Sequence, residues 1–254
     1  MIDGGDMKGI DVSTLQGVID WTRVNADFAM IKATQGRGEG VGTNLFSRFT
    51  DSKFKRNITS ARCPCGVYHY FTAQDKAKAI TEIDYYCSII EPYRKNITLW
   101  AALDVESKYL DGLSKTELTA IVRTALERIE THGFKPMLYT NPNFLKYRFE
   151  PGAFNDTDIW LAHWGVSKPY FVPNLMIWQY GTTRTDGIST DVDADYGYFA
   201  VDTYKVGDKY TIKAGDKYSN GVSVPARLIG KSYTIMQVRE SKILLGEISS
   251  WVKI

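Results

Sequence analysis

The chain of 254 residues is poor in the residues that build disulfide frameworks and metal knuckles, with three cysteines and three histidines. An odd and low cysteine count gives no disulfide framework. Cys63 and Cys65 are one residue apart rather than the two of a zinc knuckle, and no histidine lies near them in a ligand pattern. We therefore expect Cys63, Cys65 and Cys87 to be core thiols, and we predict neither a metal nor another cofactor.

Long apolar runs are missing as well. No segment reaches the roughly 18 apolar residues that a membrane span requires, so no membrane insertion is expected. Residues 1–6 are acidic and glycine-rich, without the basic and apolar regions of a secretory signal. They are either native or an extension ahead of an alternative start at Met7.

A strong excess of charge of one sign is also absent, since the net charge is +2. Residues 201–254 carry nine basic and five acidic side chains, whereas the first 200 carry 22 and 24. A basic tail favours a polyanionic surface such as a Gram-positive wall, although a solvated face explains it equally well. No nucleic-acid partner is expected.

Tyrosine and tryptophan are abundant, at 16 and 6 residues, which suits either stacking on sugar rings or a well-filled core.

Short apolar segments alternate with helical ones up to residue 200, which predicts an α/β fold with a largely parallel sheet. An open sheet and a closed barrel both fit this alternation. The late connections look too short for full helices, so we expect an irregular, TIM-like β/α barrel with some helices missing. Ser114 and Glu117 form a capping box and Gly133 ends that helix. The predicted strands are Lys8–Val12, Phe28–Ala33, Gly66–Phe71, Leu99–Val105, Pro136–Thr140, Ile159–Ala162 and Leu175–Gln179, and the predicted helices are Asn44–Ala61, Asp75–Ile90 and Ser114–His132.

The pattern of apolar and polar residues changes near Asp202, and no helical pattern follows it. Short strands punctuated by glycine predict a second, small all-β barrel. The domains are therefore expected at residues 1–202 and 203–254. Gly-Asp-Lys-Tyr occurs at 207–210 and again at 215–218, which is either a minor duplication or chance around two turns. The strands expected here are Lys209–Ile212, Val222–Pro225, Ser232–Val238, Lys242–Leu245 and Ser249–Val252.

Acidic residues close several barrel strands, and parallel barrels place their sites at those strand ends. Asp11 ends the first strand, Asp104 and Glu106 follow a central strand at i, i+2, and Asp193 and Asp195 lie near the end of the barrel region. Converging carboxylates are what glycosidic cleavage needs, because one acid must be protonated and another charged. A divalent cation site is the rival interpretation. The absence of a glycine-rich phosphate loop weakens it.

The order of these motifs resembles glycoside hydrolase family 25, the Chalaropsis-type lysozymes. The likeness covers about residues 7–200. Its motifs are Gly9-Ile10-Asp11-Val12-Ser13, Gln16-Gly17, Ile19-Asp20-Trp21, Phe28 to Gly36, Gly66-Val67-Tyr68-His69-Tyr70-Phe71, Leu103-Asp104-Val105-Glu106, Leu138-Tyr139-Thr140, Trp160-Leu161-Ala162-His163-Trp164, Ile177-Trp178-Gln179-Tyr180 and Val192-Asp193-Ala194-Asp195.

The resemblance implies a muramidase that cleaves the β-1,4 bond from N-acetylmuramic acid to N-acetylglucosamine in peptidoglycan. It implies that Glu106 is the general acid and that Asp104 orients the 2-acetamido group or a neighbouring acid. Asp11 and Asp193 would complete the carboxylate ring. Asp195, one strand step from Asp193, is a substrate contact or takes the part of Asp193 instead.

Aromatic residues at the strand ends are expected to line the sugar groove, although each is also an ordinary core residue. They are Tyr68, Tyr139, Trp160 and Trp178. His69 and His163 either line the groove or are hydrogen-bonded core residues. A Cys–His peptidase is not favoured, because no cysteine is placed as its nucleophile.

The spacing of Asp104 and Glu106 does not decide the stereochemistry. Two residues apart in a strand corresponds to about 6–7 Å, and side-chain rotation spans both the retaining and the inverting separations. We favour a substrate-assisted, retaining route in which the acetamido oxygen is the nucleophile, because it explains an aspartate beside the acid.

The tail resembles bacterial SH3-like modules of wall hydrolases. Tyr210, Tyr218, Tyr233 and Trp251 are candidate wall contacts, or else they fill the core of the little barrel. A tail used for dimerisation is a further alternative, and the oligomeric state is not predicted.

Peptidoglycan of a Gram-positive wall is the expected partner. Without a signal peptide, the protein would be made in the host cytoplasm and act on the wall after release, as a phage or prophage endolysin does. The alternatives are a wall-sugar-binding protein without turnover and a chitinase-like glycosidase.

Overall fold

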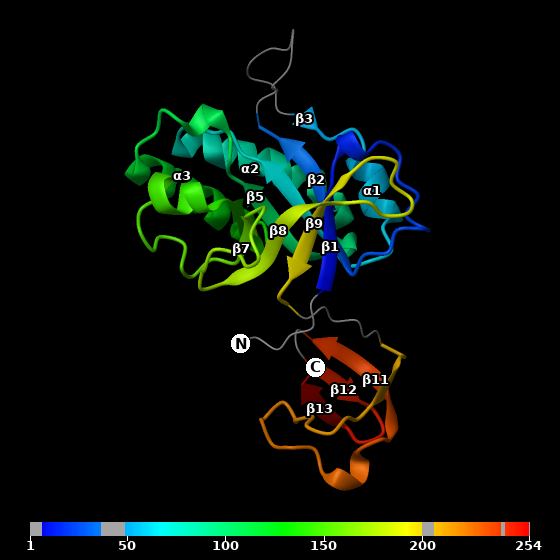
Figure 1. Ribbon diagram of the computed structural model, residues 1–254. Helices are drawn as coiled ribbons and strands as arrows, with labels where there is room; N and C mark the ends of the chain where they lie inside the picture. Colours follow the sequence, from blue (N-terminus) through cyan, green and yellow to red (C-terminus); the bar gives the residue numbers. More distant parts are fainter. Residues whose placement is uncertain (1–6, 37–48, 200–205, 240–241, 254) are drawn as a thin grey trace. The chain divides into compact units, whose positions relative to one another are not determined.

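The computed structural model describes residues 7–36, 49–199, 206–239 and 242–253 (Figure 1). The chain divides into two compact units, Met1–Phe199 and Ala200–Ile254. The boundary expected at residues 202 and 203 and the extension expected at 1–6 lie outside the described residues. In the described ranges, no helix has both the length and the apolar character that a membrane crossing needs.

The first unit is built on eight strands that close into a barrel. Strand β1 hydrogen-bonds both to β2 and to β9, so the sheet has no free edge between its first and last strands. Strand β3 (Phe49–Thr50) is added outside the barrel, antiparallel to β2. The barrel strands are β1 (Met7–Val12), β2 (Phe28–Gln35), β4 (Cys65–Tyr70), β5 (Ile97–Asp104), β6 (Pro136–Thr140), β7 (Ile159–Ala162), β8 (Leu175–Thr183) and β9 (Val192–Gly197).

One strand runs against the others. Strands β1 to β8 pair in parallel around the barrel, but β9 is antiparallel to both of its neighbours, β8 and β1. The connection from β8 to β9, residues 184–191, contains no helix. The strand–helix alternation of the sequence predicts a largely parallel barrel with some helices missing, and the closed eight-stranded barrel confirms this. The start of β9, rather than its end, therefore lies at the mouth of the barrel.

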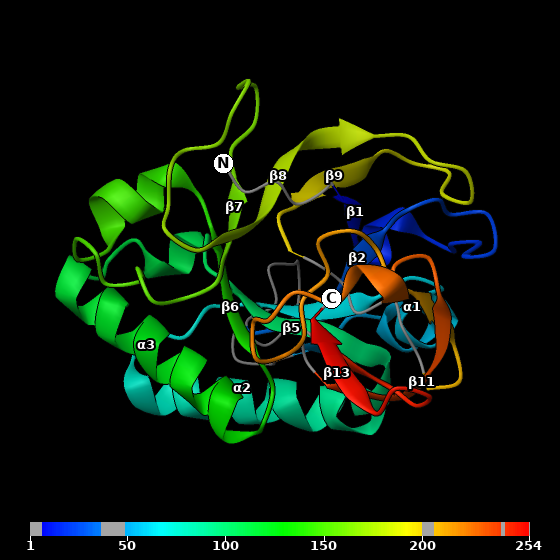
Figure 2. The same cartoon turned by 90° about the horizontal axis from the view of Figure 1, so that it is seen from below.

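Three α-helices cover the barrel: α1 (Phe54–Ser60), α2 (Lys76–Ile90) and α3 (Lys115–Thr131). Helices α2 and α3 lie side by side (Figure 2). The Arg128 guanidinium of α3 donates to both carboxylate oxygens of Asp84 on α2, over 2.6 and 3.0 Å. The shorter turns are η1 (Thr14–Gln16), η2 (Glu91–Asn96), η3 (Lys108–Leu110) and η4 (Phe144–Arg148).

The helix expected at Asn44–Ala61 is confirmed over Phe54–Ser60 and wrong at Phe49–Thr50. Residues 44–48 lie outside the described residues, Phe49–Thr50 is a strand, and the helix begins only at Phe54. Asp51 explains the break, because its carboxylate accepts the backbone N–H groups of Lys53 and Thr14, each over 2.8 Å. An aspartate that bonds its own backbone two residues on forms a turn instead of a helix.

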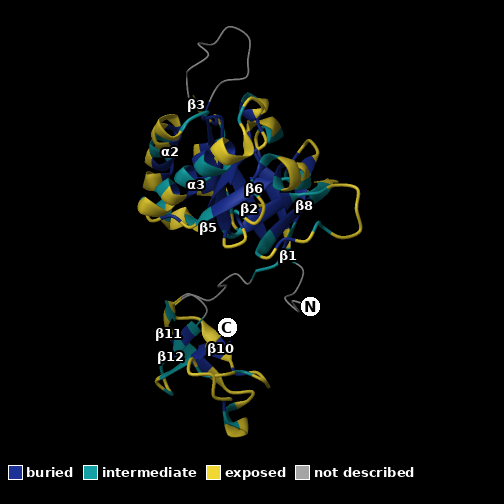
Figure 3. Cartoon of the chain, turned by 90° about the vertical axis from the view of Figure 1, so that its left-hand side faces the viewer, coloured by how far each residue is buried: buried dark blue, intermediate teal, exposed yellow. Residues whose placement is uncertain are grey.

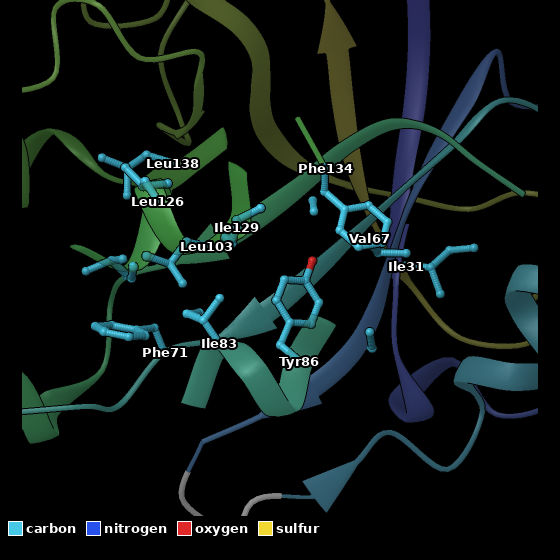
Figure 4. Packing of buried hydrophobic residues seen from close by; sticks show 14 of the residues in the cluster. Ile31, Val67, Phe71, Ile83, Tyr86, Leu103, Leu126, Ile129, Phe134 and Leu138 are labelled. Atoms are coloured by element: carbon cyan, nitrogen blue, oxygen red, sulfur yellow. The ribbon is translucent and has the colours of Figure 1, made fainter. Parts of the chain in front are cut away.

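The buried residues are concentrated in the strands of the barrel, whereas the helices are exposed on their outer side (Figure 3). They form two clusters, one inside the barrel and one between the strands and the helices. Because successive strand side chains point to opposite faces, odd and even positions go to different clusters. On β5, Trp100 and Ala102 lie inside the barrel, whereas Ala101 and Leu103 pack outward toward the helices. Figure 4 shows the outer cluster, with Leu103 among the helix residues. The same alternation turns Asp104 inward at the end of β5.

The cysteines are free. Cys65 and Cys87 are buried in the outer cluster and Cys63 packs against it. This confirms their interpretation as core thiols.

The second unit is a four-stranded antiparallel sheet in the order β10 (Lys209–Thr211), β11 (Ser232–Arg239), β12 (Lys242–Leu245) and β13 (Ser250–Lys253), with a short turn η5 (Ala226–Leu228). Tyr210 and Tyr233 lie in its core. The strand expected at Val222–Pro225 is wrong, since only an isolated bridge from Ser223 to Lys217 forms there. Both Gly-Asp-Lys-Tyr segments begin at a glycine with a φ of +97°, a left-handed conformation that favours glycine, so the repeat marks two turns.

The N-cap of α3 gives a test of local stability. The Ser114 hydroxyl accepts from the Glu117 backbone N–H, and the Glu117 carboxylate accepts from the Ser114 backbone N–H over 2.9 Å. Replacing Ser114 by alanine removes one of these bonds, so we expect Ser114→Ala to lower the free energy of unfolding by about 1 kcal/mol. Urea unfolding measures this. Ser88→Ala is the control, an exposed position within α2 whose hydroxyl donates to the Tyr85 carbonyl over 2.7 Å but caps no helix N-terminus. An equal loss in both variants would contradict the capping role.

Candidate active site

A pocket of about 190 Å³ lies at the mouth of the barrel, where the parallel strands end. Strand ends from around the barrel contribute to it, as expected for a β/α barrel. Its lining combines four acids with aromatic and amide side chains: Asp11, Ser13, Leu15, Gln16, Lys32, Tyr68, Tyr70, Asp104, Glu106, Tyr139, Trp160, Gln179 and Asp193.

All four acids that were predicted to be catalytic line this pocket. Asp11 on β1 and Asp193 on β9 are direct partners across the antiparallel pair. Asp104 ends β5, and Glu106 follows two residues later. The structure therefore brings together side chains that are up to 182 positions apart in the sequence. The antiparallel course of β9 is what places an acid from the start of that strand beside acids from strand ends.

The acids differ in their exposure. Asp11 and Asp104 are 6% and 5% exposed, Asp193 is half-buried, and Glu106 is exposed to solvent. One oxygen of Asp104, Oδ1, is buried without any hydrogen-bond partner among the described residues. A buried acceptor without a donor is costly, so such an atom is suited to receive a donor from a ligand.

Burial and charge crowding act together on the acids at the β1–β9 pair. The pKa of Asp11 is raised well above its usual value, first by burial and then by the charges of Asp195 and Asp193. A hydrogen bond from Gln179 opposes part of this shift. Burial also raises the pKa of Asp193.

The pair on β5 is influenced by a lysine. Burial and the charge of Glu106 raise the pKa of Asp104, and burial of the surrounding pocket raises the pKa of Glu106 although its side chain reaches solvent. Lys32 lowers both pKa values by its positive charge. Lys32 comes from β2, where its ammonium group donates to Gln35 Oε1 over 3.0 Å and lies 5.2 Å from the centre of the Tyr70 ring.

Three of the four aromatic residues expected in the groove line the pocket, namely Tyr68, Tyr139 and Trp160. Trp178 does not. Its neighbour Gln179 points into the barrel, so Trp178 points outward, where its ring packs near Tyr180 and its indole N–H donates to the His163 carbonyl over 2.8 Å. The placement of Trp178 in the groove is therefore corrected.

Asp195 is not a pocket residue either. It is fully buried, and its Oδ1 accepts the indole N–H of Trp160 over 2.8 Å. With no exposed surface, it has no access to a substrate in this structure, which corrects the interpretation of Asp195 as a substrate contact. Asp193, two residues earlier on the same strand, occupies the pocket instead.

Gln179 organises the floor of the pocket. Its Oε1 accepts from the Tyr139 hydroxyl over 3.1 Å and from the Trp164 indole over 3.0 Å, while its Nε2 donates to Asp11 Oδ2 over 2.8 Å. Two donors on the oxygen fix the orientation of the amide. The amide thus connects Asp11 to two aromatic residues of the site.

The histidines belong to the structural frame. His69 is fully buried, between the Thr34 hydroxyl at 2.7 Å and the Glu82 carboxylate at 2.8 Å. This confirms the interpretation of His69 as a hydrogen-bonded core residue. The Nδ1 of His163 accepts the Tyr170 backbone N–H over 2.9 Å, and His163 does not line the pocket. Over the described ranges, no three His, Cys, Asp or Glu side chains are arranged to hold a metal ion.

Comparison with known proteins decides the family. The model of glycosyl hydrolases family 25 matches residues 10–188. This chain belongs to glycosyl hydrolase family 25. Its matched segment runs from the middle of β1 to the β8–β9 connection and contains all the pocket residues except Asp193.

Several lysozymes and related enzymes resemble this family 25 member. Lysozyme M1 of Streptomyces globisporus is 31% identical over 211 residues, covering 75% of this chain and 67% of the relative. The bacterial lysozyme of Streptomyces coelicolor shares its fold with a TM-score of 0.59 and 26% identity, covering 78% and 94% of the two chains. The CTP1L endolysin shares the fold alone, with a TM-score of 0.60 and 24% identity over 75% and 66%.

Lys32 and Gln179 were missed as site residues of this glycosidase, although both lie within quoted motifs. The available signal was the alternation of side chains along β2 and β8, which turns Lys32 and Gln179 into the barrel like Met30 and Ile177. Gln179 shares its face with Ile177, which lies in the barrel interior. A lysine on a strand of an apolar barrel was a second signal, because lysine is rarely buried without a partner.

The effect of Lys32 on the acids gives a direct test. Removing its positive charge destabilises the ionised form of a nearby carboxyl, so Lys32→Met should raise the pKa of Glu106 further. Titration of ¹³C-labelled glutamate side chains by NMR measures this. Lys55→Met, an exposed position on α1 away from the pocket lining, should leave the Glu106 titration in place. A Glu106 titration unmoved by Lys32→Met would contradict the proposed electrostatic coupling.

Proposed function

We propose that this family 25 hydrolase is an N-acetylmuramidase with Glu106 as its general acid. The chain is a peptidoglycan hydrolase of the lysozyme type, and the bond cleaved is the β-1,4 link from N-acetylmuramic acid to N-acetylglucosamine. The observation that carries the proposal is an exposed glutamate with a raised pKa in a pocket that three further carboxyl groups line. A raised pKa lets a carboxyl group hold its proton to higher pH, and a carboxyl group that also faces solvent is suited to protonate a leaving group.

Asp104 is proposed to bind the 2-acetamido group of the muramic acid. Its Oδ1 is buried and has no donor among the described residues. The acetamido N–H is a donor of the right kind for this oxygen. Such a bond turns the acetamido oxygen toward C1 of the sugar, which fits a substrate-assisted route.

The proposed reaction proceeds in two steps with retention at C1. Glu106 gives its proton to the glycosidic oxygen as the bond from that oxygen to C1 breaks, and the acetamido oxygen attacks C1 to form a cyclic oxazolinium ion. A water molecule then attacks C1 and gives a proton to the Glu106 carboxylate, and the bond from the acetamido oxygen to C1 breaks. Asp11 and Asp193 stabilise the positive charge that develops on the sugar.

Tyr68, Tyr139 and Trp160 are proposed to contact the sugar at the pocket. Trp160 packs edge-to-face against both tyrosines, with ring centres 5.7 and 4.6 Å away. This packing holds the three rings rigidly. Rigid aromatic faces bind sugar at a low cost in side-chain entropy.

The test compares wild type with Glu106→Gln on purified Gram-positive peptidoglycan. Loss of the acid proton should slow hydrolysis by about 10²–10⁴-fold, the usual effect of a general acid. The new ends are reduced with borohydride and identified, and we expect reduced muramic acid from wild type. Reduced glucosamine would identify a glucosaminidase. An inactive wild type would favour a binding protein without turnover, and activity on chitin alone would favour a chitinase-like enzyme.

We also propose that residues 203–254 form an SH3-like wall-binding domain and residues 1–202 the catalytic domain. Tyr210 and Tyr233 fill the core of the second unit, which leaves Tyr218 and Trp251 as the partly accessible aromatic candidates. The Trp251 ring lies 5.4 Å from the Arg239 guanidinium and 5.6 Å from the Lys242 ammonium group. An aromatic face beside cations suits a wall that carries both sugars and anionic groups.

The biological setting proposed is a phage or prophage endolysin that reaches a Gram-positive wall after release from the host cytoplasm. The fold shared with the CTP1L endolysin supports this setting. Peptidoglycan is its partner there.

Wall binding is tested in the full chain carrying Glu106→Gln, so that the wall is not digested. We expect Trp251→Ala to weaken sedimentation with cell walls about tenfold or more, because a central aromatic contact costs about 2 kcal/mol when removed. Met236→Ala, which is 52% exposed on β11, is the matched control. Equal binding by the two variants would remove Trp251 from the proposed contact surface.

A further inference from the structure

Asp195 is a buried acid that the mechanism above does not use. It lies on β9 opposite Gly9 of β1, one strand step below the Asp11–Asp193 pair. Its side chain is fully buried, and its Oδ2 has no hydrogen-bond donor among the described residues. Within the described ranges, the donor to this carboxyl group is the Trp160 indole N–H, which bonds Oδ1 over 2.8 Å. A fully buried carboxylate oxygen without a donor is strongly unfavourable if the group is charged.

The neighbour of Asp195 is Asp11. Asp195 pairs with Gly9 across the β1–β9 ladder, so Asp195 and Asp11 are diagonal neighbours on the same face of the sheet. Two carboxylates at this separation repel each other, whereas one carboxyl and one carboxylate form a strong hydrogen bond. Asp193 and Asp104 add further negative charge around the pair. The one lysine that lines the pocket, Lys32, acts on Asp104 and Glu106. The surroundings therefore favour one proton on the Asp11–Asp195 pair.

The two acids are not equivalent hosts for that proton. Asp11 borders the pocket, and its Oδ2 accepts from Gln179 Nε2, whose amide is fixed by two donors on its oxygen. A fixed donor and access to the pocket both stabilise a negative charge on Asp11. Asp195 has neither pocket access nor a donor for Oδ2. Burial raises the pKa of Asp195 to about 8, although hydrogen bonds with Trp160 and Asp11 lower it, and burial also raises the pKa of Asp11. The two groups therefore compete for the proton, and their different donors and access to the pocket decide between them.

We propose that Asp195 is a neutral carboxylic acid in the working enzyme, and that its Oδ2–H donates to Asp11 and keeps Asp11 ionised and correctly oriented. Asp195 is thus a positioning residue, acting on substrate only through Asp11. The proposal rests on the proposed function in so far as Asp11 acts there as a charged group. It makes Trp160, Asp195, Asp11 and Gln179 one continuous hydrogen-bonded chain below the pocket.

Asparagine substitution distinguishes the two possible hosts of the proton. Asparagine has the shape of a protonated aspartate and keeps an N–H donor and a carbonyl acceptor. Asp195→Asn should therefore retain kcat/KM on peptidoglycan within about threefold, whereas Asp195→Ala, which loses the donor, should fall about tenfold or more. Asp193→Asn on the same strand and Asp11→Asn should both lose most activity. Loss in Asp195→Asn as large as in Asp195→Ala, or tolerance of Asp11→Asn with loss in Asp195→Asn, would overturn the proposal.

The pH profile separates positioning from mere structural damage. Without its donor, the ionised form of Asp11 is less stable, so the acidic limb of kcat/KM should move to higher pH in Asp195→Ala. In Asp195→Asn the limb should stay at the wild-type pH. An unmoved acidic limb in Asp195→Ala would show that Asp195 does not control the charge of Asp11.

The pH dependence of the free energy of unfolding tests the proposal independently of catalytic activity. The native pKa of Asp195, about 8, is higher than the roughly 3.9 of an unfolded aspartate. Its contribution to the free energy of unfolding is therefore fully present below about pH 4 and is lost as the pH rises through about 8. Asp195→Asn cannot ionise, so its stability relative to wild type should increase from about pH 5 to about pH 8, which both lie within this window. A difference that is constant with pH would overturn the proposal, even if wild type proved inactive on every wall.

Discussion

The antiparallel pairing of β1 with β9 is the interaction on which the rest of the active site depends. It closes the barrel, and its register sets Asp11 opposite Asp193. A parallel last strand would have presented its final residues at the mouth and carried Asp193 to the far end. The closure that satisfies the backbone hydrogen bonds of two edge strands is thus the same feature that completes the set of carboxyl groups.

Inside this frame, burial rather than any single charge controls the acids. It is the leading cause of the raised pKa at Asp11, Asp104, Glu106 and Asp193. Crowding among the acids then adds to that effect, while Lys32 and Gln179 oppose it at particular groups. The result is a pocket in which acids of one chemical type have different exposures and different donors. Those differences allow one to give a proton while another remains charged.

Much of the site was predictable from sequence. Strand–helix alternation predicted the barrel, and acids at the expected strand ends, together with the resemblance to family 25, predicted that Asp11, Asp104, Glu106 and Asp193 share one site, as the pocket lining shows. Trp178 was misplaced because adjacent residues of a strand point to opposite faces, so an error of one residue turns a side chain to the wrong face. Gln179 points into the barrel, and its neighbour Trp178 therefore points outward. Asp195 was misplaced because the distance of a residue from the barrel mouth depends on the direction of its strand. The sequence motifs do not reveal that β9 runs antiparallel to its neighbours. The helix expected from residue 44 was overridden at Asp51 by contacts with the loop after β1.

The pairing of Met7 with Gly197 has a consequence for how such enzymes are assembled from parts. It joins the two chain ends of the barrel at the side opposite the pocket. The barrel sheet is complete at this pair, so a segment appended to the sequence after it does not interrupt any strand that carries a site residue. Appended modules can therefore be exchanged between related enzymes, by evolution or in the laboratory, while the bond-cleaving part keeps its geometry.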